Sequence, residues 1–190
     1  MKNTQPVRRR DAAATKSAIL SAARTLFARD SYENVGIREI ASLAGVDAAL
    51  VSRYFGSKEE LFSQVLCSGK RGIDVIGSEV EGLPERAADL LLDPEDEEKP
   101  MDDILIMLHS GTSSIAGPLV RESIDDRFHG PFAEIIGGED AKIRAQLFGA
   151  VLLGISISQQ TSGDLALAPE LHTKLKARLT EIIELAIAPL

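Results

Sequence analysis

The sequence predicts an all-α protein with a small N-terminal helical domain and a larger helical C-terminal domain. Apolar residues recur at intervals of three and four over most of the 190 residues. No hairpin turn signal joins alternating segments in the C-terminal part. Charge also divides the chain, because residues 1–60 carry ten Lys and Arg against seven Asp and Glu, whereas residues 61–190 carry eleven against twenty-two. A basic segment therefore precedes an acidic one.

Residues 1–10 contain three consecutive arginines and no apolar periodicity, so we expect a disordered basic arm. The arm is either a solvated tail or a segment that adds contacts to a polyanion. Asp11 is a good cap for a first helix. One face of that helix carries Ile19, Ala22, Ala23, Leu26 and Phe27.

Two short helices follow, joined by a tight link. The first spans residues 37–44 and ends at Gly45, where a helix stops in the left-handed conformation. Asp47 caps the second helix, residues 48–55, which ends before Gly56. Neither helix is long enough to be stable alone, so both must pack on the first helix. The sequence therefore predicts a helix-turn-helix over residues 11–57, a motif that inserts its second helix into the major groove of DNA.

The rest of the chain, residues 58–190, is predicted to form one helical domain. Ser57 and Glu60 match the capping box, and the helix that they begin, residues 58–69, connects the two domains. We expect a break at Gly117–Pro118 and a kink at Gly130–Pro131. A charged loop at residues 93–100 separates further helices at residues 83–92, 102–114, 119–136, 139–162 and 170–188. The last two are long, and the short connection between them sets them antiparallel.

Several function classes are excluded by the composition. The single cysteine, Cys67, rules out an internal disulfide and a cysteine-based metal cage. The three histidines have no partners at metal-ligand spacing, and we expect no metal and no cofactor. No catalytic motif is present, so the chain is not predicted to be an enzyme. Without a signal peptide or an apolar run of about 18 to 20 residues, we expect a cytoplasmic protein with no membrane partner.

The first turn of the second short helix offers few hydrogen-bonding groups. Ala48 and Ala49 can present only methyl groups to base edges. We expect hydrogen-bonded readout from Ser52 and Arg53, with Arg38 entering from the preceding helix. The predicted DNA-binding residues are Arg38, Ala48, Ala49, Ser52, Arg53, Tyr54 and Lys58, the last two as candidates for phosphate binding.

Three segments in this region resemble the N-terminal domain of TetR-family transcriptional regulators: residues 37–41 (IREIA), 44–46 (AGV) and 51–61 (VSRYFGSKEEL). The resemblance covers residues 14–66, about a quarter of the chain. It implies phosphate-binding roles for Tyr54 and Lys58. Two departures concern Gly36, where the family usually has a threonine that caps the helix, and Ser31, which replaces a common glycine. Ser52 also replaces a frequent aromatic residue.

The resemblance further implies a C-terminal domain that binds a small molecule and dimerises through its last two helices. The apolar faces of these helices predict an interface that includes Leu147, Val151, Gly154, Leu175, Leu179, Ile182 and Ile183. No spacing rule identifies a ligand pocket. The candidates for it are Met107, His109, Phe128, Phe132 and Gln159, which mix apolar bulk with polar groups, although each is also compatible with ordinary core packing.

These observations predict a homodimeric, sequence-specific DNA-binding repressor that a small-molecule ligand releases from a palindromic operator. Three alternatives stay open. The chain could be an activator or a regulator without a ligand. It could be a redox switch through Cys67, although no second cysteine is available to resolve an oxidised thiol. It could also be an enzyme with a helix-turn-helix accessory domain, which would need a catalytic cluster that the sequence does not show.

Overall fold

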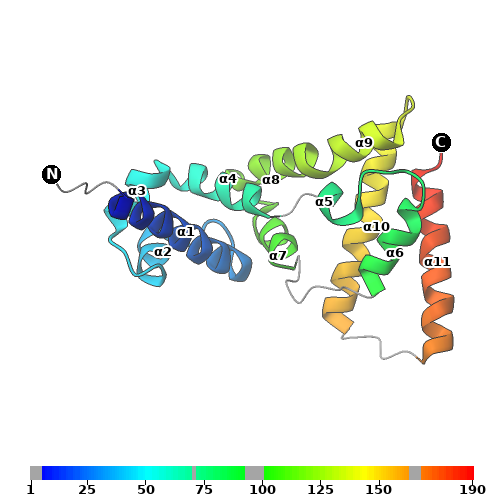
Figure 1. The fold of residues 1–190 in the computed structure, drawn as a ribbon, viewed down its shortest axis with the longest axis horizontal. Helices are drawn as coiled ribbons and strands as arrows, with labels where there is room; N and C mark the ends of the chain where they lie inside the picture. Colours follow the sequence, from blue (N-terminus) through cyan, green and yellow to red (C-terminus); the bar gives the residue numbers. More distant parts are fainter. Residues whose placement is uncertain (1–5, 70–71, 93–100, 163–167) are drawn as a thin grey trace. The chain divides into compact units, whose positions relative to one another are not determined.

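The computed structural model of the chain describes residues 6–69, 72–92, 101–162 and 168–190, and its regular structure there is entirely helical (Figure 1). The described residues divide into two compact units. We call residues 6–69 with 101–123 the head unit, and residues 72–92, 124–162 and 168–190 the body unit. The predicted all-α fold is confirmed. The predicted loop at residues 93–100 lies outside the described residues.

The head unit contains six helices, and local signals in the sequence set several of their ends. The Asp47 carboxylate accepts a hydrogen bond from the Ala49 amide at 2.7 Å, and the Ser57 hydroxyl accepts one from the Glu60 amide at 3.0 Å. Gly45 has a φ of +68°, a backbone conformation that favours glycine. The helices are α1 (Pro6–Arg29), α2 (Ile37–Leu43), α3 (Ala48–Phe55), α4 (Lys58–Ser68), α7 (Met101–Ser110) and α8 (Ala116–Ile124).

Helix α1 begins at Pro6 and not at Asp11, the predicted cap. Proline is tolerated at the first position of a helix, where its missing N–H has no partner to lose, and arginine is a good helix former. Residues 6–10 of the predicted disordered arm are therefore helical in the structure, and residues 1–5 lie outside the described residues.

Three aromatic rings from different elements form the centre of the head unit. The rings of Phe27 and Phe62 meet edge to face at 4.9 Å between centroids, and Tyr32 lies 5.1 Å from Phe62 and 5.9 Å from Phe27. All three side chains are buried. Because Phe62 belongs to α4, the helix-turn-helix shares its core with the helix that was predicted only to connect the domains.

Helix α7 packs along α1, and residues 101–123 therefore belong to the head unit. The Arg24 guanidinium on α1 forms an ion pair with Asp103 on α7, with 2.8 Å between Nη1 and Oδ1. The Ser113 hydroxyl donates a hydrogen bond to the Glu33 carboxylate, and this bond lowers the pKa of Glu33. These contacts join residues about 80 positions apart, a separation at which local sequence patterns carry no signal.

The break predicted at Gly117–Pro118 falls earlier in the chain. Helix α7 ends at Ser110 and α8 begins at Ala116, so Pro118 lies in the first turn of α8. A proline there costs no intrahelical hydrogen bond, because the first amides of a helix have no intrahelical partner.

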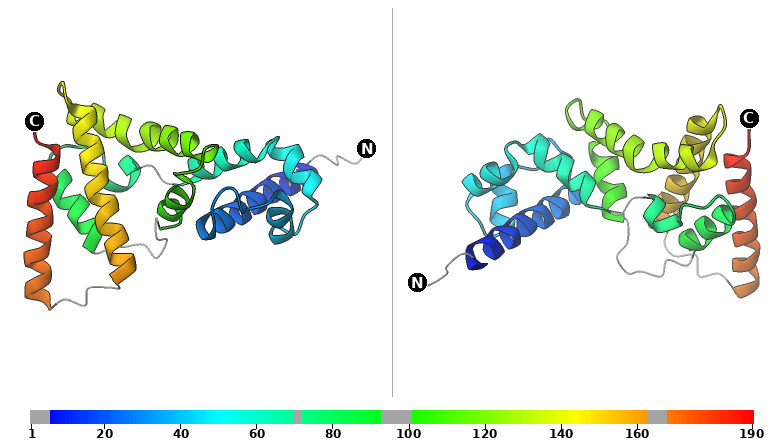
Figure 2. Two further views of the ribbon diagram at one scale, coloured as in Figure 1. Left: turned by 180° about the vertical axis from the view of Figure 1, so that it is seen from behind. Right: turned by 45° about the horizontal axis from the view of Figure 1, so that its top comes forward.

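The body unit is built around two long antiparallel helices that lie side by side (Figures 1 and 2). Its elements are α5 (Gly72–Ile76), α6 (Leu83–Leu92), η1 (Asp125–His129), α9 (Gly130–Ile136), α10 (Ala141–Ser162) and α11 (Pro169–Ile187). The core consists of apolar side chains from these helices, among them Leu83, Ala87, Phe132, Phe148, Leu179 and Ile183. The short α5 was not predicted, whereas the bounds of α6 agree with the prediction of a helix over residues 83–92.

An irregular turn occurs where the sequence predicts a kink. Residues Asp125–His129 form a π-helical turn, in which the Gly130 amide donates to the Asp125 carbonyl five residues earlier. Pro131 has no N–H and cannot continue the normal ladder of hydrogen bonds. The proline therefore accounts for the irregularity at this point.

Residues Ala141–Gln159 of α10 are long and apolar enough to cross a membrane by length and composition alone, contrary to the prediction that no apolar segment reaches that length. Core helices meet the same criterion, and Ala145 and Phe148 of α10 are buried in the body unit. The opposite face of α10 exposes Ile143, Leu147 and Leu153. The apolar composition thus reflects one face in the core and a second apolar face outside it.

Candidate nucleic-acid interface

The exposed face of α3 is formed by Ala49, Ser52 and Arg53, which recur at helical spacing. Val51 and Phe55 lie on the opposite face and are buried, so packing fixes the rotation of the helix about its axis. Ala48 and Tyr54 flank the exposed face and are half-buried. The structure therefore groups five of the predicted DNA-binding residues on or beside one helix face.

Helix α2 adds Arg38, which is exposed in the first turn. The cap of this helix is Gly36, with φ −97° and ψ 147° and no side-chain hydrogen bond. A Cβ atom at Gly36 would meet nothing within 4 Å. Neither the backbone conformation nor the available space requires a glycine at this position, and the first amides of α2 lack a side-chain cap.

Lys58 lies in a more confined place than the prediction of a free phosphate-binding side chain implies. Its ammonium donates to the Tyr32 carbonyl at 2.5 Å and lies 4.1 Å from the centroid of the Tyr32 ring. Burial lowers the pKa of Lys58, and the nearby Glu33 and Glu59 carboxylates oppose that shift. A phosphate contact would require the ammonium to share these partners or to leave them.

A further cation near α3 was not singled out in the sequence. The exposed Lys16 ammonium on α1 lies 5.3 Å from the centroid of the Phe55 ring. Its position depends on a contact between α1 and the last residue of α3, two residues that are far apart in sequence. No local motif marks it.

The five predicted ligand residues do not gather in one unit. Met107 and His109 belong to α7 of the head unit, where His109 is exposed, whereas the other three belong to the body unit. Phe132 is fully buried, with its ring 4.7 Å from that of Phe128 and 5.2 Å from that of Phe148. The Gln159 amide donates to the Leu91 carbonyl at 2.8 Å. Phe132 and Gln159 therefore serve the packing of the body unit itself.

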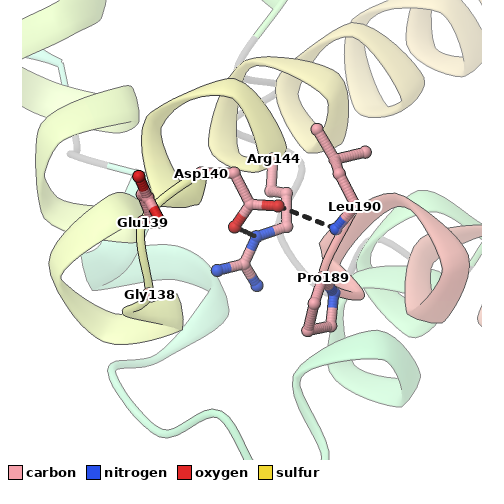
Figure 3. A pocket seen from close by; sticks show the side chains of 6 residues that line it. All are labelled: Gly138, Glu139, Asp140, Arg144, Pro189 and Leu190. Atoms are coloured by element: carbon pink, nitrogen blue, oxygen red, sulfur yellow. Dashed lines mark hydrogen bonds and ion pairs between the residues drawn. The ribbon is translucent and has the colours of Figure 1, made fainter.

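A hollow of about 460 Å³ lies where α10 begins and α11 ends (Figure 3). The Arg144 guanidinium donates to Asp140 at 2.8 Å, and the other Asp140 oxygen accepts from the Leu190 amide at 2.7 Å. This last hydrogen bond lowers the pKa of Asp140. The lining residues are Gly138, Glu139, Asp140, Arg144, Pro189 and Leu190, and none of them is a predicted ligand residue.

The residues predicted for the dimer interface divide into an exposed and a buried group. Leu147 and Ile182 are 44% and 41% exposed, and Gly154 is exposed as well, whereas Val151 and Leu175 are half-buried. Leu179 and Ile183 lie in the core of the body unit, which removes them from a surface available to a partner. On α10 and α11, the predicted interface left out four exposed apolar side chains: Ile143, Leu153, Leu171 and Leu185.

The fold and the α3 face define a helix-turn-helix DNA-binding protein with a second helical domain. Residues 19–65 match the family model described as bacterial regulatory proteins, tetR family. Residues 81–186, more than half of the chain, match the model described as tetracyclin repressor-like, C-terminal domain. The chain belongs to the TetR family of transcriptional regulators.

Solved structures of other regulators share this fold. NalD of Pseudomonas aeruginosa, described as the secondary repressor of the MexAB-OprM multidrug efflux pump, has a TM-score of 0.66 at 17% identity, over 90% of this chain and 96% of that one. A TetR transcriptional regulator from Rhodococcus sp. RHA1 has a TM-score of 0.54 at 20% identity, over 95% and 99%. A TetR-family regulator from Pseudomonas syringae has a TM-score of 0.53 at 20% identity, over 96% and 97%. No curated protein matches the sequence.

Proposed function

We propose that this TetR-family regulator is a homodimeric, cytoplasmic repressor without enzymatic activity, which binds a palindromic operator and is released by a small-molecule ligand. The observation that carries the proposal is the exposed face of α3, with Ser52 and Arg53 available to base edges and with Arg38 exposed on α2. Ala48, Ala49, Tyr54 and Lys58 complete the proposed contact set. The net charge of −11 over residues 61–190 keeps the remainder of the chain away from phosphates.

The apolar surface of the body unit supports the homodimer. Exposed apolar side chains occur on both long helices, and the largest are Ile143 and Leu147 on α10 and Leu171, Ile182 and Leu185 on α11. Exposed apolar surface on both helices supports association in water. A two-fold pairing of these helices would present two copies of α3 to two half-sites of a palindrome.

Release from the operator by a ligand is the third part of the proposal. A ligand can change DNA affinity only if it binds the DNA-competent and incompetent arrangements with different affinities. Within the body unit, Phe128 is the predicted ligand residue that is half-buried and in contact with other aromatic rings, at 5.7 Å from Phe148. Met107, His109, Phe132 and Gln159 remain secondary candidates.

Selection of binding sites from random DNA with the full chain tests the proposal. We expect one palindromic sequence whose half-sites are about one helical turn apart. Arg53→Ala should weaken binding to it by about 10-fold to 100-fold and relax the preference at one position in each half-site. Arg121→Ala, an exposed arginine on α8, is the matched control and should bind as the wild type does. Enrichment of no sequence would overturn the proposed operator binding.

A further inference from the structure

We propose that Ala49 reads the methyl group of a thymine, and that each half-site of the operator holds this thymine one or two base steps from the base read by Arg53. The inference rests on the proposed function, since it names the base chemistry that the α3 face recognises. Ala49 is the N-terminal member of the exposed α3 face, and the N-terminal turn of a recognition helix is the part that contacts base edges.

The structure leaves Ala49 no polar group to offer. Its side chain is a methyl group, and its amide already donates to the Asp47 carboxylate at 2.7 Å. In many recognition helices an N-terminal amide remains free to bind a base or a phosphate. Here the cap occupies the Ala49 amide and adds a negative charge beside it, so a phosphate is disfavoured at the same point.

The chemistry of the base edges then selects the partner of this methyl group. Guanine O6, cytosine N4 and adenine N6 would each lose hydrogen bonds to water against an apolar group, with nothing in return. The thymine C5-methyl group instead gains from the contact, because apolar surface on both sides is removed from water. An A·T pair with its thymine toward Ala49 is therefore the pair that this surface favours.

Arg53 supplies the reference point along the groove. It lies four residues after Ala49 on the same exposed face, which corresponds to about 6 Å along the helix. Base pairs are about 3.4 Å apart, and a recognition helix can cross the major groove at an angle, so two side chains at this spacing meet bases one or two steps apart. Arginine prefers guanine, which it binds through O6 and N7.

The experiment uses the full chain and the operator obtained by selection. Each thymine of one half-site is replaced in turn by deoxyuridine, which removes only the C5-methyl group. We expect one replacement, one or two steps from the position that depends on Arg53, to lower the affinity by about fourfold. Exchanging that T·A pair for 5-methylcytosine·guanine should retain more affinity than exchanging it for cytosine·guanine, because the methyl group stays in place.

Ala49→Gly, measured with the thymine and the deoxyuridine operators, completes a double-mutant cycle. The variant should bind the thymine operator more weakly and should no longer respond to the deoxyuridine at that position. Ala18→Gly, at an exposed alanine of α1 outside the proposed contact set, is the control for the effect of glycine in a helix and should still respond. Operator binding in which no thymine methyl matters, or in which Ala49→Gly responds as the wild type does, would overturn the inference while leaving the proposed function intact. Failure of the wild-type protein to bind any selected DNA sequence would instead overturn the proposed function.

Discussion

Helix α3 of the head unit and helix α10 of the body unit use their apolar side chains differently. In α3, Val51 and Phe55 are buried, and the exposed face is left to Ala49, Ser52 and Arg53. In α10, Phe148 is buried but Leu147, its neighbour in sequence, is 44% exposed. The comparison teaches that α3 uses its largest apolar side chains inside the head unit, whereas α10 leaves large apolar side chains exposed, which the proposed dimer would cover.

The largest effect expected from this comparison concerns Leu147. Leu147→Glu places a charge on the exposed apolar face of α10 and should convert the proposed dimer to a monomer. Because the two head units would then bind their half-sites independently, operator affinity should fall by at least about 100-fold. Analytical ultracentrifugation and a gel-shift titration measure the two effects. Val80→Glu, at an exposed valine outside both long helices, is the control. A variant that stays dimeric would contradict the proposed interface.

A smaller effect is expected at Lys58, where the structure and the family resemblance suggest different partners. Lys58→Gln removes the contact with the Tyr32 carbonyl and ring, so the melting temperature should fall by a few degrees. We propose that the ammonium also binds a phosphate in the complex. The slope of the logarithm of the binding constant against the logarithm of the salt concentration should then become shallower by about one per subunit.

Lys142→Gln is the control for charge, since Lys142 pairs with Asp125 in the body unit at 2.8 Å. An unchanged salt dependence in Lys58→Gln, together with a lower melting temperature, would show that Lys58 only supports the loop around Tyr32. That result would remove Lys58 from the proposed contacts with DNA.

The ion pair between Arg24 on α1 and Asp103 on α7 should contribute about 1 kcal/mol to the stability of the head unit. Arg24→Met keeps much of the apolar stem and removes the ion pair with Asp103, whose side chains are 24% and 26% exposed. Chemical denaturation measures the loss. Lys176→Met is the matched control, because it breaks a more exposed ion pair with Asp89 in the body unit and should cost less. Equal losses of stability in the two variants would contradict a larger contribution from the ion pair between α1 and α7.

The smallest expected effect is a gain in stability. Gly36→Ser adds a capping hydroxyl to α2 at a position with open space, and should stabilise the chain by a few tenths of a kcal/mol. The same substitution at Gly45 is the control of opposite sign, because its φ of +68° is unfavourable for serine. Thermal unfolding of the two variants should therefore shift in opposite directions.

The sequence alone determined the features that depend on residues within about four positions of one another. Asp47, Ser57 and Gly45 predicted where helices begin and end, because capping hydrogen bonds and a left-handed turn are local. The spacing of these signals was enough to predict the helix-turn-helix and its exposed face. The resemblance to the family rests on the same short segments.

Only the tertiary structure decided what depends on residues far apart in the chain. Apolar periodicity shows that α11 has an apolar face, but not that Ile183 is buried while Leu185 is 77% exposed. It also carries no sign that α7 joins the head unit, or that Tyr32 holds the Lys58 ammonium. The physical reason is that burial is a property of neighbours brought together by folding, whereas a local pattern records only which side chains can be buried.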